Sequence, residues 1–170
     1  MPATTLVLGG ARSGKSGWAE AQMAGGPALY LATGQALDDE MAERIRRHRA
    51  RRGPLWTTCE EPLDLPAVLA RQAEPGRPVL VDCLTLWLSN LMHAGRDVDA
   101  ATTELCAVLA TPAGPVVLVS NEIGLGLVPE TRLGRDFRDH QGRLNQRVAA
   151  TCRRVVFVAA GLPLFLKDEA

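Results

Sequence analysis

Near its N-terminus the chain reads Thr5-Leu6-Val7-Leu8-Gly9-Gly10-Ala11-Arg12-Ser13-Gly14-Lys15-Ser16, an apolar run followed at once by the pattern G-x-x-x-x-G-K-S. A strand that ends in this pattern and opens a helix is typical of a P-loop, whose backbone N–H groups wrap a phosphate chain. The helix N-terminus adds positive potential, the lysine reaches the β- and γ-phosphates, and the serine coordinates Mg²⁺. The stretch therefore predicts that residues 9 to 16 bind a nucleoside triphosphate, with Ser16 as a metal ligand.

Beyond this loop, short apolar runs alternate with stretches of helical period. That alternation indicates strands and crossover helices, so we predict an α/β fold: a P-loop NTPase-like (RecA-like) three-layer sandwich with a mostly parallel sheet. A last short strand near 163–167 should return antiparallel, because Gly161-Leu162-Pro163 leaves no room for a crossover helix. The other strands are expected at about 4–8, 28–32, 55–58, 78–82, 115–120 and 155–160, and the helices at about 15–24, 36–51, 64–73, 84–94, 98–110 and 134–151.

Composition narrows the domain count, the partners and the location. A chain of 170 residues without repeats or a linker is expected to form a single domain, 1–170. A formal charge of zero and 4% aromatic residues argue against nucleic acid as a partner. The longest apolar run, 155–166, is too short for a membrane span, and no signal peptide is present, so we expect a cytoplasmic protein. Scattered cysteines without C-x-x-C spacing indicate core residues in a reducing compartment: Cys59, Cys83, Cys106 and Cys152.

A carboxylate ends another buried strand, Pro78-Val79-Leu80-Val81-Asp82. In P-loop proteins such an aspartate holds the magnesium ion, so Asp82 is the candidate second metal ligand or nucleotide contact and a catalytic residue. The alternative is that Asp82 only caps the helix that follows it.

The arginine-rich segment Leu37–Arg52 has its acids in the first turn and its bases in the last, which suits the helix dipole. Met41, Ile45 and His48 fall at i, i+4 and i+7, so the imidazole shares a face with apolar residues while arginines surround it. Spacing alone leaves two interpretations open. His48 is either a packed boundary residue on a solvated basic helix, or a nucleophile in a phosphate-binding patch, where nearby cations favour the neutral imidazole.

Several motifs together resemble one family, the bifunctional adenosylcobinamide kinase and adenosylcobinamide-phosphate guanylyltransferases of cobalamin biosynthesis. The similarity spans nearly the whole chain and is far more specific than the P-loop. It is carried by Gly9–Ser16, Leu29-Tyr30-Leu31-Ala32-Thr33, Asp38-Asp39-Glu40-Met41, Arg44-Ile45 to His48, Ser120–Glu130, Arg135–Asp139, Gly142–Arg147 and Gly161–Leu164.

The resemblance implies two reactions at one nucleotide site. ATP or GTP first phosphorylates the hydroxyl of the aminopropanol arm of adenosylcobinamide, and a histidine, matched by His48, then attacks the α-phosphorus of GTP and carries GMP to the cobinamide phosphate. Lys15 and Asp82, predicted from the P-loop and the strand-end carboxylate above, are the other expected catalytic residues. A homotrimer with sites between chains is implied as well. Further implied nucleotide contacts are Thr33, Gly34, Gln35, Arg51, Arg52, Gly53, Pro54 and Glu60.

One departure from the family pattern lies in this last group: Gly53 intervenes between Arg52 and Pro54, where the family commonly has proline directly after arginine. Asn121 and Glu122 should end a buried strand beside the P-loop, followed by Gly124 and Gly126, which would let backbone approach the corrinoid or the phosphates. The alternative is that this segment is only a flexible connection that carries a helix cap.

Two rival functions stay open. One is a small-molecule kinase without guanylyl transfer. The other is a nucleotide-dependent regulatory switch, against which the chain lacks an N-K-x-D guanine-reading motif.

Overall fold

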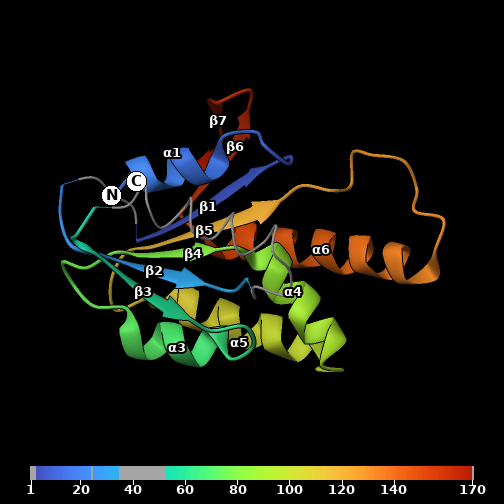
Figure 1. The fold of residues 1–170 in the computed structure, drawn as a ribbon, viewed down its shortest axis with the longest axis horizontal. Coiled ribbons are helices and arrows are strands. Elements are labelled where there is room, and N and C mark those ends of the chain that lie inside the picture. The colour runs from blue at the N-terminus through green and yellow to red at the C-terminus, as the bar shows by residue number, and fades with distance from the viewer. Residues whose placement is uncertain (1–2, 24, 35–52, 170) are drawn as a thin grey trace.

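The computed structural model describes residues 3–23, 25–34 and 53–169 (Figure 1). The predicted elements in these ranges are confirmed to within a few residues, whereas the expected helix 36–51 lies outside them. The strands are β1 (Thr4–Gly9), β2 (Ala28–Ala32), β3 (Trp56–Glu60), β4 (Val79–Asp82), β5 (Val116–Asn121), β6 (Arg154–Ala159) and β7 (Leu162–Asp168). The helices are α1 (Lys15–Ala21), α3 (Leu65–Gln72), α4 (Leu84–His93), α5 (Val98–Ala110) and α6 (Arg132–Thr151).

The strands form one seven-stranded sheet in the order β3-β2-β4-β5-β1-β6-β7. All neighbouring pairs are parallel except β6 and β7, which confirms the predicted antiparallel return. Because β5 lies between β1 and β4, the carboxyl ends of these three strands meet at one edge. In the register, Gly9 is opposite Asn121, and Asp82 is opposite Val119. This edge is where an α/β sheet of this kind binds its ligand.

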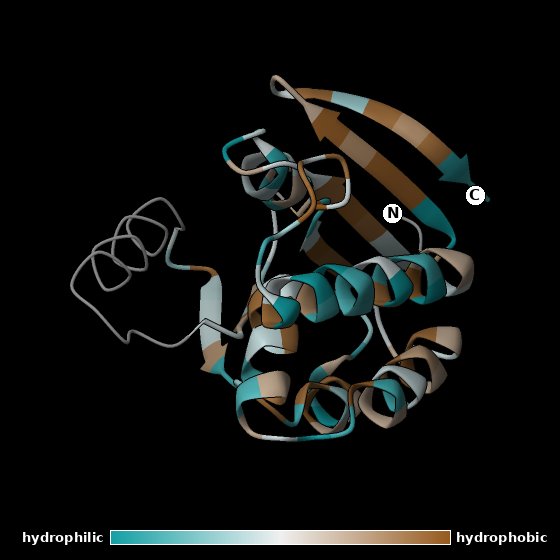
Figure 2. Cartoon of the chain, turned by 90° about the vertical axis from the view of Figure 1, so that its right-hand side faces the viewer, coloured by the Kyte–Doolittle hydropathy of each residue, from teal (hydrophilic) through white to brown (hydrophobic). Residues whose placement is uncertain are grey.

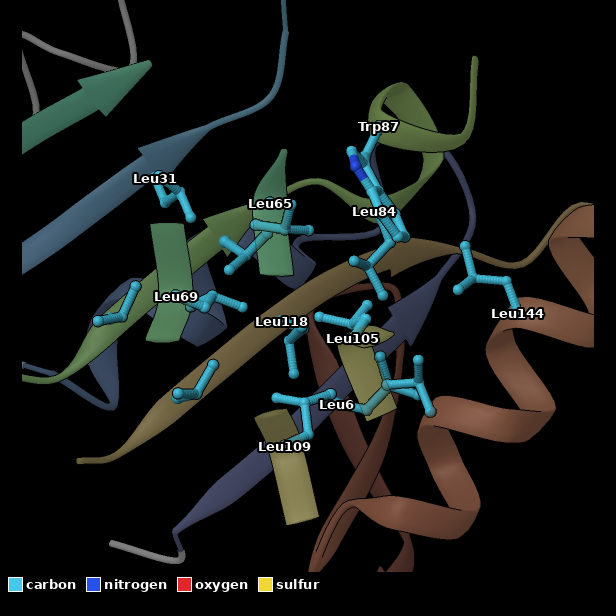
Figure 3. Packing of buried hydrophobic residues seen from close by; sticks show 14 of the residues in the cluster. Leu6, Leu31, Leu65, Leu69, Leu84, Trp87, Leu105, Leu109, Leu118 and Leu144 are labelled. Carbon is cyan, nitrogen blue, oxygen red and sulfur yellow. The ribbon is translucent and has the colours of Figure 1, made fainter. Parts of the chain in front are cut away.

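Side chains alternate between the two faces of the sheet and bury different helices on each. On one face, leucines such as Leu6, Leu31 and Leu118 pack against α3, α4, α5 and α6, as Figure 3 shows. On the other face, Val7 and Val119 belong to a smaller cluster with α1. Each fully buried aliphatic side chain stabilises the fold by about 1.5–3 kcal/mol. The predicted three-layer α/β arrangement is therefore confirmed (Figure 1).

The hairpin of β6 and β7 forms an edge of the sheet with apolar residues on its outer strand, seen as brown segments in Figure 2. Phe165 of β7 packs edge-on against Trp18 of α1, with ring centroids 6.3 Å apart, which ties the hairpin to α1. Side chains more than half exposed on the same strand are Leu162, Leu164 and Leu166.

Ion pairs on α6 and the state of the cysteines complete the description. Arg132 pairs with Asp136 at 3.6 Å, and Arg138 pairs with Asp139 at 3.6 Å. All four cysteines are free, with Cys83 and Cys152 buried and Cys59 and Cys106 half-buried. Among the helices of the described residues, none combines the length and the apolar character needed to cross a bilayer.

Candidate nucleotide-binding site

The P-loop joins β1 to α1 and has the backbone that its glycines permit. Gly14 precedes α1 with φ of 96°, a left-handed conformation that side chains other than glycine rarely adopt. Lys15 is buried at the first position of α1, and its Nζ donates a hydrogen bond to the Gly10 carbonyl oxygen at 2.8 Å. The ammonium is thus held over the loop, close to where the backbone N–H groups of a P-loop meet a phosphate chain.

A hydroxyl inside this loop adds a donor. Ser13 Oγ is buried and has no hydrogen-bond partner among the residues that the structure describes. A buried hydroxyl without a partner is costly, and an anionic oxygen can accept its proton. The loop therefore has the donors that a phosphate group requires.

The C-terminal hairpin supports the loop from the other side. The turn between β6 and β7 has positive φ at both Ala160 (51°) and Gly161 (79°), as tight I′ hairpin turns require. The Gly161 N–H donates to the Ser13 carbonyl oxygen at 2.8 Å. A β-carbon on Gly14 would lie 3.0 Å from the Gly161 Cα, so this close approach also needs glycine at position 14. The P-loop is therefore built by two segments far apart in the sequence.

The first glycine of the motif gives a prediction about stability. A β-carbon on Gly9 would lie 2.5 Å from the Val158 carbonyl oxygen and 2.6 Å from Ser13 Oγ, whereas one on Gly10 would meet no atom within 4 Å. We expect Gly9→Ala to lower the free energy of unfolding by about 1–3 kcal/mol through overpacking. Gly10→Ala is the matched control and should leave the free energy of unfolding nearly unchanged. Urea unfolding of both variants measures the difference, and equal values would contradict the packing argument.

Asp82 ends β4 on the face of the sheet that α1 covers. Leu80, two residues earlier, belongs to the α1-side cluster, and alternation places Asp82 on the same side. Tyr30 of β2, which also belongs to this cluster, donates its hydroxyl to Asp82 Oδ2 at 3.1 Å. Cys83, not Asp82, is at the N-cap of α4, and no side-chain hydrogen bond caps that helix. The alternative interpretation of Asp82 as a helix cap is therefore not observed.

The electrostatics around Cys83 bring Lys15 and Asp82 together. Burial first, and then the negative charge of Asp82, raise the pKa of the Cys83 thiol to about 11, while the charge of Lys15 lowers it. The thiol is therefore neutral at neutral pH rather than a thiolate nucleophile. Lys15 and Asp82 both act on this buried thiol, which belongs to the cluster on the α1 face of the sheet.

Thr33, at the end of β2, is engaged with β4 and α4 on all its polar groups. Its hydroxyl donates to the Cys83 carbonyl oxygen at 2.7 Å and accepts from the Cys83 N–H at 2.9 Å. Its N–H donates to the Asp82 carbonyl oxygen at 3.3 Å, and its carbonyl oxygen accepts from Asn90 Nδ2 at 2.8 Å. Thr33 thus fastens the Asp82–Cys83 segment, and its contact with nucleotide stays a prediction, as does that of the neighbouring Gly34.

Some of the remaining predicted residues are described by the structure, and the others lie outside the described ranges. Glu60, which is described, ends β3, exposed and opposite Ala32, so it lies at the carboxyl edge of the sheet. Gly53 and Pro54 are exposed just before β3, where the Trp56 N–H donates to the Gly53 carbonyl oxygen at 3.1 Å. The predicted residues outside the described ranges are Gln35, His48, Arg51 and Arg52.

Sequence reasoning missed the role of Tyr30. A single tyrosine in the otherwise aliphatic run 28–32 was the available signal, because it lies on the same face as the strand-end carboxylate of the neighbouring strand. The two side chains meet because β2 and β4 are parallel neighbours in a particular register. That register could not be predicted from the sequence.

The sequence comparisons with known proteins agree with one another. The model of the family described as cobinamide kinase / cobinamide phosphate guanyltransferase matches residues 5–166. The chain is 51% identical over 168 residues to the "Bifunctional adenosylcobalamin biosynthesis protein CobP" of Pseudomonas aeruginosa, covering 96% of this chain and 97% of that one. It is 40% identical over 178 residues to the CobU protein of the same description from Salmonella typhimurium, covering 95% and 98%. Among solved structures, the P4 protein from bacteriophage phi6 in complex with ADP aligns with 95% of this chain and 52% of its own, at 15% identity and a TM-score of 0.49.

Proposed function

Because the chain belongs to the cobinamide kinase / cobinamide phosphate guanyltransferase family, we propose that one nucleotide site on a single domain catalyses both phosphorus transfers of adenosylcobalamin biosynthesis that this name describes. The observation that carries the proposal is the P-loop at the end of β1, with Lys15 buried at the start of α1 and Asp82 on the same face of the sheet. The rival function, a regulatory switch, differs in that it would use neither an acceptor alcohol nor a histidine nucleophile.

In the first reaction, the hydroxyl oxygen of the aminopropanol arm of adenosylcobinamide attacks the γ-phosphorus of ATP or GTP. The bond from the γ-phosphorus to the bridging oxygen breaks, the nucleoside diphosphate leaves, and the hydroxyl proton passes to solvent or to a nearby base. The N–H groups of Gly9–Ser16 and the ammonium of Lys15 hold the phosphates in line and stabilise the charge that develops on the leaving oxygen.

In the second reaction, a ring nitrogen of His48 attacks the α-phosphorus of GTP. A phosphorus–nitrogen bond forms, and pyrophosphate leaves. A phosphate oxygen of adenosylcobinamide phosphate then attacks the same phosphorus, the phosphorus–nitrogen bond breaks, and adenosylcobinamide-GDP is released with neutral His48 restored. Gln35, Arg51, Arg52, Gly53, Pro54 and Glu60 are proposed to contact this nucleotide.

The donor set at the P-loop fits Mg²⁺. Ser16 offers a hydroxyl in the first turn of α1 and Asp82 a carboxylate, both hard oxygen donors of the kind that Mg²⁺ prefers. Two protein oxygens suffice, since a nucleotide-bound Mg²⁺ keeps several waters and takes its other ligands from the phosphates. When bound, the ion would neutralise phosphate charge. The role of this chain is then to present Ser16 and Asp82 in fixed orientations.

The hydrogen bond from Tyr30 orients Asp82 and so gives a prediction. Tyr30→Phe removes only the hydroxyl that donates to Asp82 Oδ2, and loss of such an outer partner weakens metal affinity by about 10- to 100-fold. We expect a shift of this size in the Mg²⁺ concentration needed for half-maximal binding of GTP, measured by calorimetry without acceptor. Trp87→Phe, which alters a buried aromatic on the opposite face, is the control. A Tyr30→Phe curve that matches the wild type would show that Asp82 is not a ligand or does not depend on Tyr30.

Two measurements test the function itself. With γ-labelled GTP or ATP and adenosylcobinamide, the label should appear in adenosylcobinamide phosphate. Intact mass after incubation with GTP and Mg²⁺ should show one added GMP per chain, stable in alkali and released by acid. Kinase activity without the adduct would leave a simple kinase, and GTP hydrolysis with neither product would leave a switch.

We also propose that the active form is a cytoplasmic homo-oligomer, such as a trimer, with small-molecule substrates only. Exposed apolar side chains on β7 and on the loop after β5, including Leu125 and Leu127, support association between chains. A corrinoid is also large for a domain of 170 residues. Light scattering coupled to size-exclusion chromatography gives the molar mass, and a monomer at working concentration would contradict the proposal.

A further inference from the structure

We propose that Asn121 is a further catalytic residue: its side-chain amide contacts the terminal phosphate of the bound triphosphate, and Thr85 and Asn145 position it. The inference rests on the proposed triphosphate site and names a group that completes it.

Asn121 occupies the central place at the carboxyl edge of the sheet. It ends β5, which lies between β1 and β4, so it stands between the strand that opens the P-loop and the strand that ends in Asp82. Its register partner on β1 is Gly9, the first residue of the loop. The next residue, Glu122, donates its N–H to the Gly9 carbonyl oxygen at 3.0 Å. The end of β5 and the start of the P-loop therefore form one rigid unit.

Alternation along β5 gives the direction of the side chain. Val117 and Val119 belong to the cluster under α1, whereas Leu118 belongs to the cluster on the opposite face. Ser120 faces α6, as its hydrogen bond to Asn145 shows. Asn121 therefore points to the α1 face. The α1 face also carries Lys15, Asp82 and the Tyr30 hydroxyl. The half-buried Asn121 therefore joins the groups that are proposed to surround the phosphates.

The main chain of Asn121 is held by two side chains from different helices. Its N–H donates to Thr85 Oγ1 of α4 at 2.9 Å, and its carbonyl oxygen accepts from Asn145 Nδ2 of α6 at 3.0 Å. A terminal strand residue would ordinarily be held by its neighbouring strands or by water. Here both polar groups of one peptide unit are fixed from the α4–α6 face, and the side chain on the other face is left for the site.

Asn145 is itself fixed in a buried polar network. Its Oδ1 accepts from Ser120 Oγ at 2.7 Å and from Gln141 Nε2 at 3.0 Å, which leaves Nδ2 oriented toward Asn121. Gln141 also donates to Ser120 Oγ at 3.0 Å. Ser120, Gln141 and Asn145 are all buried, and apolar residues of the same volume would fill the space at no greater cost in stability. Such a network is understandable where a functional side chain has to be held to within a fraction of an ångström.

The chemistry of an amide suits this place. A neutral amide N–H can donate to a phosphate oxygen without competing for the metal ion, and a donor aimed at the transferred group strengthens as charge spreads over its oxygens. A contact with the terminal phosphate exists for a nucleoside triphosphate and not for a diphosphate. It should therefore affect GTP binding and not GDP binding.

The test compares binding of GTP and GDP by calorimetry in Mg²⁺. Asn121→Ala is expected to weaken the affinity for GTP by about 10- to 100-fold, since one hydrogen bond to a charged group is lost. The affinity for GDP should change by less than about threefold. Asn121→Asp keeps the size but places a negative charge against the phosphate, and it should weaken GTP more strongly still. Equal losses for GTP and GDP, or no loss for either, would overturn the assignment.

The positioning residues are tested with nearly isosteric changes. Asn145→Asp keeps the size and the oxygen that accepts from Ser120 and Gln141, but it replaces the donor to Asn121 with a carboxylate oxygen that repels the Asn121 carbonyl oxygen. Thr85→Val replaces the hydroxyl that accepts from Asn121 with a methyl group. Both variants should lose affinity for GTP but not for GDP, as Asn121→Ala does. Thr85→Ser keeps a hydroxyl and should keep the wild-type ratio of GTP affinity to GDP affinity. Thr102→Val is the control, because Thr102 is an equally buried threonine whose hydroxyl bonds within α5. If Asn145→Asp and Thr85→Val lower thermal stability without changing the ratio, their role is only structural.

Failure of the inference and failure of the proposed function are distinguishable. If the function is wrong, the wild-type protein does not phosphorylate adenosylcobinamide. If only the inference is wrong, the wild type does so and the variants keep its preference for GTP over GDP.

Discussion

Replacement of His48 by alanine is expected to remove the GMP adduct completely and to slow formation of adenosylcobinamide-GDP by about a thousandfold or more, because His48 is the proposed nucleophile of the covalent step. The kinase step needs no imidazole and should fall far less. Intact mass after incubation with GTP measures the adduct, and a coupled assay for adenosylcobinamide phosphate measures the kinase. The resulting separation of the two reactions is the largest single effect that we expect.

The other two histidines provide matched controls for this substitution. His93 sits at the end of α4 with its Nδ1 2.7 Å from the Ser89 carbonyl oxygen, and His140 lies 3.0 Å from an Arg143 nitrogen on α6. His93→Ala and His140→Ala should keep the adduct. An adduct that persists in His48→Ala and vanishes in either of these variants would show that His48 is not the nucleophile.

Lys15→Met should lower the rates of both reactions together, by about 100- to 1,000-fold, the usual cost of removing one preorganised donor from a developing negative charge. The ammonium is buried and donates a hydrogen bond to the Gly10 carbonyl oxygen. Methionine can fill much of the same space without the charge. Burying a charge is costly, and we therefore expect the free energy of unfolding to stay equal or to rise slightly. Loss of activity with retained stability separates a role in catalysis from a role in folding.

Lysine occurs at only one other position, Lys167 on β7. Its Nζ donates a hydrogen bond to the Ala150 carbonyl oxygen at 3.1 Å. Lys167→Met removes the same charge far along the chain and should leave both rates unchanged. Loss of only one of the two reactions in Lys15→Met would mean that the two nucleotides bind differently, and the proposal of one shared site would be wrong.

Much of the fold follows from the sequence because each element carries its own signal. The apolar runs at 4–8 and 78–82 predicted β1 and β4, and the turn at Gly161 predicted the antiparallel β7. These signals are local: alternation, period and glycine placement are read within one segment. The order of strands in the sheet is a property of several segments together. That β5 separates β1 from β4 was expected only in part, through the placement of Asn121 beside the P-loop.

Lys15 and Asp82 were predicted as site residues because each belongs to a motif that combines chemistry with context, and their roles stay predictions. A residue that acts through a contact across the fold could not be predicted in this way. Asn145 and Gln141 are polar positions in the buried stripe of α6, at i and i+4, and this break in an apolar face was the signal available. Its meaning depended on which strand lay beneath the helix. His48 remains a prediction from resemblance, outside the described residues.

The support that β6 and its hairpin give to the P-loop has a consequence for biogenesis. The Arg153 N–H bonds to Thr4 Oγ1, a separation of 149 residues, and β1 also needs β5 as its other neighbour. During translation the segment that is to grip the nucleotide emerges early, yet its flanking partners leave the ribosome more than a hundred residues later. Until then an apolar strand stays uncovered, and contacts of such long range form slowly. Nascent chains stalled before residue 154 should therefore bind chaperones but not GTP.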